Sequence, residues 1–174
     1  MPASLALKLV FIAKSPPTPG ETEQDERYFY RPSMGRPSHL LKDITIAMYG
    51  QEVFENENKE ELLRRFRDDG CFLIDVSEKP VNKLSPKERY EVIENSLEDL
   101  ARRVRGVDPE HIIIIKKTIF EQVRRILAAN GYSERILGEG LPFPSHGHQR
   151  RFVEKLRELL KHVNFRETLQ GGEL

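Results

Sequence analysis

The stretch HIIIIKKTIFEQVRRILAANG, residues 111–131, joins four consecutive isoleucines directly to an amphipathic pattern. A continuous run of β-branched residues is typical of a strand that is covered on both faces, as in a parallel sheet. The apolar residues that follow recur at spacings of three and four, which predicts a helix with one buried face. The stretch therefore predicts a strand followed by a helix that packs back onto the sheet.

The same alternation is found along the rest of the chain. The segment LALKLVFIA predicts a buried strand from Leu7 to Ala13, and CFLIDV (71–76) predicts a second strand. A short fourth strand is expected within residues 135–144. Further helices are expected over 38–50, 58–70, 84–107 and 148–163.

The helix over 84–107 has the clearest pattern. Ser85 is expected to cap it, Pro86 fits its first turn, and Glu88 completes a capping box. The residues expected on its buried face are Tyr90, Ile93, Leu97, Leu100 and Val104.

This order of elements predicts an α/β fold, a three-layer α/β/α sandwich with a central, mostly parallel sheet of about four strands. We expect a single domain over residues 1–174, with a disordered tail over 165–174. The long loop from Pro16 to Pro37 contains three aromatic residues in succession, Tyr28, Phe29 and Tyr30. Loops of about 20 residues in a compact domain are usually functional or disordered.

The composition is that of an ordinary globular domain, with 38% hydrophobic and 32% charged residues. Lys and Arg total 28, as do Asp and Glu, which argues against a strongly electrostatic nucleic-acid binder. The single cysteine, Cys71, excludes an internal disulfide and a zinc site built on cysteine. No apolar run has the length of a membrane span and no secretory signal is found, so we expect a cytoplasmic protein with no membrane partner.

Ligands of parallel sheets bind outside the carboxyl ends of the strands. This rule predicts one crevice whose ionisable lining is Lys14, Asp75, Lys116, Lys117 and His146. Neither a GxxxxGK[ST] loop nor a GxGxxG turn is present, and His146 and His148 lack a third partner for a metal ion. We therefore expect no metal and no cofactor.

Three of these strand ends resemble motifs of the uracil-DNA glycosylase superfamily. AKSPP (13–17) is similar to the family's first motif, often GEAPG, and places Lys14 where an acidic, water-positioning residue is common. LPFPS (141–145) is similar to the last motif, often HPSP, and places Leu141 on the histidine. Asp75 falls on an asparagine that reads the base. Two of the family's usual polar groups are thus replaced, which argues against ordinary uracil excision.

The resemblance implies a protein that binds a nucleobase or nucleic acid in this crevice, with base excision from DNA by non-standard residues as its activity. It implies stacking by Tyr28, Phe29 or Tyr30 and reading of the base edge by Asp75. Lys14 and His146 are the catalytic candidates, with Lys14 either stabilising the departing base or acting as an amine nucleophile. The phosphate would be bound by Ser145, Gly147, His148, Lys116 and Lys117.

Two alternatives stay open at the level of sequence. The chain is then either a non-catalytic nucleotide-binding or scaffold protein of the same fold, or an enzyme of small phosphorylated metabolites that uses its lysines as phosphate ligands. For the corner around Ser145, the simpler interpretation is that this serine caps the last helix and the histidines are exposed.

Overall fold

The computed structural model describes residues 7–17, 29–30, 38–144 and 147–165. Within these residues a sheet of four strands is formed by β1 (Leu9–Ala13), β2 (Cys71–Asp75), β3 (His111–Ile115) and β4 (Ile136–Leu141). All neighbouring strands are parallel, and their order is β2-β1-β3-β4. The sheet predicted from the alternation of strands and helices is confirmed.

Helices connect each pair of strands. Between β1 and β2 lie α1 (His39–Tyr49), α2 (Gln51–Asn56) and α3 (Lys59–Asp68), and α4 (Pro86–Val107) connects β2 to β3. After β3 come α5 (Lys117–Ala129) and the short 3-10 helix η1 (Ser133–Arg135), and α6 (Gln149–Leu160) follows β4.

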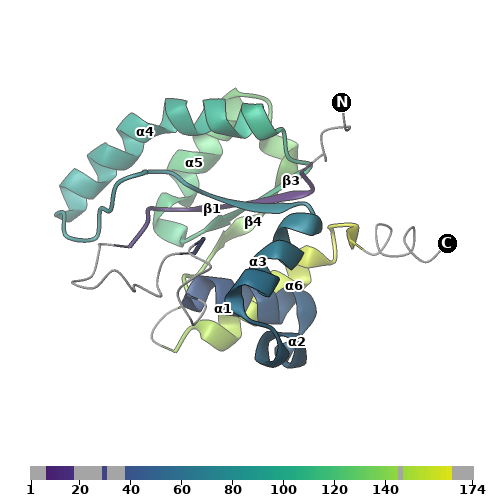
Figure 1. Cartoon of the computed structure of the whole chain (residues 1–174). Helices are drawn as coiled ribbons and strands as arrows, with labels where there is room; N and C mark the ends of the chain where they lie inside the picture. The colour runs from purple at the N-terminus through teal and green to yellow at the C-terminus, as the bar shows by residue number, and fades with distance from the viewer. Residues whose placement is uncertain (1–6, 18–28, 31–37, 145–146, 166–174) are drawn as a thin grey trace.

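The helices cover both faces of the sheet, which gives the predicted three-layer α/β/α sandwich (Figure 1). Alternate residues of β1 belong to different cores. Leu9 and Phe11 pack in the cluster that includes residues of α1, α3 and α6, and Val10 and Ile12 pack in the cluster with α4 and α5. All four are fully buried, as a strand in the middle of a parallel sheet requires.

At the start of α4 one prediction is confirmed and another is wrong. The hydroxyl oxygen of Ser85 accepts a hydrogen bond from the Glu88 N–H at 3.2 Å, so the predicted cap is confirmed. Tyr90, expected on the buried face, is 54% exposed, whereas Ile93 and Leu97 are buried. A helix of 22 residues is about 33 Å long and a strand of five residues about 17 Å, so the first turns of α4 extend beyond the strand ends.

The helix predicted over 38–50 ends at Gly50, whose φ of 94° lies in the left-handed region that favours glycine. The chain then re-enters a helix as α2, which the sequence pattern did not indicate. Of the tail predicted over 165–174, only Phe165 lies within the described residues, and it packs against the core formed with α1 and α6.

Candidate functional site

The order of the strands places a ligand-binding crevice between β1 and β3. From β1 the chain passes to β2 on one side and later to β3 on the other side, so the direction of the strand order reverses at β1. In such sheets the crevice lies outside the carboxyl ends of the strands at this switch point. Lys14 follows β1 and Lys116 follows β3, so both lysines lie at the predicted crevice.

A cavity of about 440 Å³ lies at this edge of the sheet, within the usual range for small-molecule sites. Its lining combines lysines, a carboxyl group, aromatic rings and the start of α1. The lining residues include Lys14, Phe29, Tyr30, Ser38, His39, Asp75, Asn82, Lys116 and Phe143.

The side chain of Lys14 is an unusual amine. The pairing of β1 with β2 continues past the strands, because the Ser77 N–H donates to the carbonyl oxygen of Lys14 at 3.0 Å, and this fixes the backbone at the mouth of the cavity. Burial is the main cause that lowers the pKa of Lys14 to about 8, followed by the charge of Lys116, a hydrogen bond between the two amines, and the charge of Arg89. About a tenth of the Lys14 amines are therefore neutral at pH 7, several hundredfold more than for an ordinary lysine.

Lys116 has a strained backbone. Its φ of 87° and ψ of 115° are rare for a residue with a side chain, and such strain costs of the order of 1–3 kcal/mol. The surrounding contacts hold it in place, because its N–H donates to the carbonyl oxygen of Leu141 at 2.6 Å and its Nζ lies 5.9 Å from the centre of the Phe143 ring. Strain of this kind is frequently found at functional sites.

Asp75, at the end of β2, contributes a carboxyl group to the same cavity. Burial raises its pKa to about 6, and the charge of Arg103 opposes this shift. The guanidinium of Arg103 donates to the main-chain carbonyl oxygens of Asp75 at 2.7 Å and Val76 at 2.9 Å. In the described part of the chain the carboxyl group itself has no hydrogen-bonding partner, so near neutral pH it can both accept and, when protonated, donate.

Aromatic residues form the apolar wall. Phe29 is 9% exposed and packs edge-on against Phe66 in the core. The hydroxyl of Tyr30 accepts from the Leu73 N–H at 2.6 Å and donates to the Leu73 carbonyl oxygen at 3.2 Å, and its ring stacks on Phe72. Tyr30 is 42% exposed. Of these two predicted stacking residues, Tyr30 therefore offers the larger accessible ring.

The structure brings together Lys14, Phe29, Tyr30, Asp75 and Lys116 at one cavity, but it places Lys117, Gly147 and His148 elsewhere. Lys117 lines a different hollow with Lys155 and Glu158. Gly147 and His148 are exposed at the start of α6 and do not line the cavity, and His148 makes no side-chain capping bond. Tyr28, Ser145 and His146 lie outside the described residues, so their predicted roles stay predictions.

Leu141, which the resemblance places on the family's histidine, is buried in the core. Its backbone carbonyl binds Lys116, but its side chain offers no polar group to the cavity. Of the predicted ionisable residues within the described ranges, Lys14, Lys116 and Asp75 thus line the cavity.

Sequence reasoning missed the contribution of α1 and of the loop after β2. Ser38 caps α1 through a 3.1 Å bond from the Leu41 N–H, and the next residue, His39, reaches the cavity together with Asn82. The motif SHLL signalled only the start of a helix. Asn82 lies in the polar stretch after β2, where strand-end reasoning could have found it.

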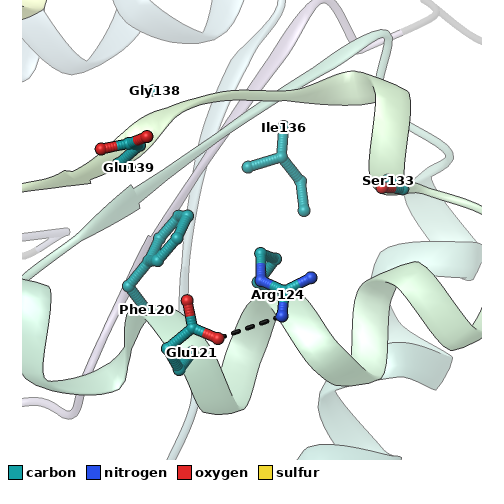
Figure 2. Close-up of a pocket in the computed structure, with 7 residues that line it drawn as sticks. All are labelled: Phe120, Glu121, Arg124, Ser133, Ile136, Gly138 and Glu139. Carbon is teal, nitrogen blue, oxygen red and sulfur yellow. Dashed lines mark hydrogen bonds and ion pairs between the residues drawn. The ribbon is translucent and has the colours of Figure 1, made fainter.

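A second hollow, of about 580 Å³, lies along α5 and β4 (Figure 2). Figure 2 shows Phe120 and Ile136 facing it and a dashed line between Arg124 and Glu121. The Arg124 guanidinium donates to the Glu121 carboxylate at 3.0 Å. Because these two charges already pair with each other and the hollow is not at the switch point, we place the candidate site at the 440 Å³ cavity lined by Lys14 and Lys116, which we call the lysine cavity.

No helix in the described ranges is both long and apolar enough to cross a bilayer. Among the same residues, no group of three or more His, Cys, Asp or Glu side chains is arranged to hold a metal ion. Comparison of the chain with models of known protein families and with curated proteins gives no match.

Proposed function

We propose that the chain binds a flipped-out nucleobase of DNA in the lysine cavity, as a protein of the uracil-DNA glycosylase type, and excises it with non-standard residues. The observation that carries this proposal is the combination of Lys14, Lys116 and Asp75 with aromatic walls in one cavity at the switch point. A base would stack on the exposed ring of Tyr30 and present its polar edge to Asp75 and Asn82.

The lysines suit the charge that base excision creates. When the glycosidic bond breaks, electrons move to the departing base, and a cation close to that base stabilises the transition state. Lys14 and Lys116 lie together at the strand ends, and Arg89 adds positive charge. This arrangement takes the place of the polar groups that the family usually has at Lys14 and Leu141.

The partially raised pKa of Asp75 extends the range of bases it can read. An ionised carboxylate accepts from donors such as the exocyclic amine of cytosine, whereas the protonated form also donates to a carbonyl such as that of uracil. With a pKa of about 6, both forms are present slightly below neutral pH.

The test uses labelled duplexes that carry uracil, hypoxanthine, or mismatched cytosine or thymine. Alkali after incubation cleaves the strand wherever a base has been removed, and a denaturing gel reveals the product. We expect cleavage of at least one duplex, loss of cleavage in Lys14→Ala, and retention in Lys117→Ala, because Lys117 does not line the cavity. If no duplex is cleaved and none binds saturably at low salt, the proposal is wrong.

One observation favours a second candidate, an enzyme of a small phosphorylated metabolite. The chain carries no net charge, while the cavity concentrates two lysines. Salt separates the two candidates, because DNA binding through several phosphates weakens steeply between 50 and 200 mM salt (about a thousandfold or more for six contacts), and a small-molecule site weakens far less.

A further inference from the structure

We propose that Lys14 forms a covalent imine with an aldehyde in the cavity, and that its substrate is the ring-opened sugar of an abasic site in DNA. The choice of this aldehyde rests on the proposed function, whereas the reactivity of the amine is argued from the position of Lys14 beside Lys116 in the cavity. The inference gives the site an imine-forming activity on DNA that has already lost a base.

Imine formation requires a neutral amine that is accessible to a ligand. Lys14 lines the cavity beside Lys116, and in the described part of the chain no carboxylate forms an ion pair with it. Desolvation and a neighbouring cation are the two arrangements that activate lysine as a nucleophile in proteins. Both are present here, and the lowered pKa of Lys14 agrees with them.

The groups around Lys14 suit the separate steps. The Nζ lone pair attacks the aldehyde carbon, and the carbonyl electrons move to the oxygen, which takes a proton from the ammonium of Lys116. The resulting carbinolamine loses this oxygen as water, with one hydrogen coming from Nζ, and leaves a carbon–nitrogen double bond. Arg89 adds positive charge near the amine, and Tyr30, His39 and Asp75 are the ionisable groups that line the cavity besides the two lysines.

The backbone of Lys116 supports this role. Its left-handed conformation directs the chain from β3 into α5, and its Nζ lies over the Phe143 ring. The strain at Lys116 is thus located at the residue that faces the nucleophile. Lys117, the next residue, is exposed and lies in another hollow, so it is a matched control on the same turn.

The experiment is reductive trapping of the full chain with a labelled duplex that contains one abasic site. Sodium borohydride supplies hydride to the imine carbon and converts it into a stable secondary amine, which appears as a protein–DNA band on a denaturing gel. We expect trapping by the native chain and by Lys117→Ala. We expect at least a hundredfold less in Lys14→Arg, which keeps the positive charge but cannot form an imine. Peptide mass spectrometry should locate the adduct on Lys14.

The pH dependence of the trapping rate shows whether Lys14 is the reacting amine. Lys116→Met removes the main neighbouring charge, so the midpoint of the pH profile of the trapping rate should move to higher pH. Each unit by which the Lys14 pKa rises lowers the rate at pH 7 about tenfold. Trapping that continues in Lys14→Arg, or an adduct located on another lysine, would overturn the inference.

Two outcomes separate this inference from the proposed function. Excision of a base without any trapped adduct would overturn imine formation and leave the proposed function intact. Trapping of 2-deoxyribose 5-phosphate on Lys14, without binding or trapping of DNA, would overturn the abasic-site substrate and the proposed function together, while the reactive amine would stand.

Discussion

Replacing Lys14 with methionine should stabilise the protein at neutral pH. Burial and the neighbouring Lys116 lower the pKa of Lys14 from 10.5 to about 8, so the folded state disfavours the charged amine that the unfolded chain carries. A shift of this size corresponds to about 3 kcal/mol at 1.36 kcal/mol per unit. Because the amine is part-exposed, solvent screening reduces the expected effect to about 1–2 kcal/mol.

The sign of the pH dependence follows from proton binding. Between pH 8 and 10.5 the unfolded chain retains a proton on Lys14 that the folded state has lost, so the native protein gains stability as the pH rises. The advantage of Lys14→Met should therefore be complete below about pH 8 and nearly absent by pH 10.5. Groups remote from Lys14 titrate alike in both proteins, and their effects cancel in the difference.

Urea denaturation at pH 7 and pH 10, followed by circular dichroism, measures this difference. Lys117→Met is the control, since Lys117 is exposed and should show a change below about 0.5 kcal/mol at both pH values. A Lys14→Met variant that is less stable than the native protein at pH 7, or whose advantage does not shrink with pH, would refute the proposed state of Lys14.

Three further predictions concern the neighbours of the cavity. Asp75→Asn should raise the free energy of unfolding by about 1 kcal/mol at pH 7.5 and leave it unchanged below pH 4. Burial raises the pKa of Asp75 to about 6, so the folded state penalises the carboxylate only above the ordinary pKa of 3.8. Thermal melts at both pH values test this, and an equal gain at both would contradict it. Tyr30→Phe removes both hydrogen bonds between the hydroxyl and Leu73 and should lower the free energy of unfolding by about 1–2 kcal/mol. Hydrogen exchange of the Leu73 amide should become faster, and unchanged exchange would contradict the prediction. Arg103→Met leaves the carbonyls of Asp75 and Val76 without their donor and should cost about 2–3 kcal/mol in urea denaturation, and a neutral effect would show that water replaces the guanidinium.

The sequence pattern predicts the fold well because the residues of the central strands are compatible with few other secondary structures. β1 is apolar throughout and β3 has four consecutive isoleucines after His111, as is typical of strands covered on both faces. Tyr90 shows the limit of periodicity, since the pattern marks the face of a helix but not where the helix extends past the sheet.

The site could be predicted only in part. Lys14, Asp75 and Lys116 follow from the rule that ligands bind at strand ends, and the structure places them in one cavity. The same rule assigns Lys117 to this crevice, but Lys117 lines another hollow. Successive residues at the start of a helix point about 100° apart, so Lys116 and Lys117 face different directions. The approach of His39 depends on how α1 packs under the sheet, which no local pattern reveals.

The two hydrogen bonds of Tyr30 also affect how the molecule meets other chains. Within the described residues β2 is an outer strand of the sheet, and the outward N–H and carbonyl groups of such a strand are a template on which a strand from another molecule can assemble. At Leu73 both groups are already bound by the Tyr30 hydroxyl, so the sheet cannot be extended there unless this tyrosine leaves. The side chain that walls the cavity thereby protects the protein against edge-to-edge aggregation.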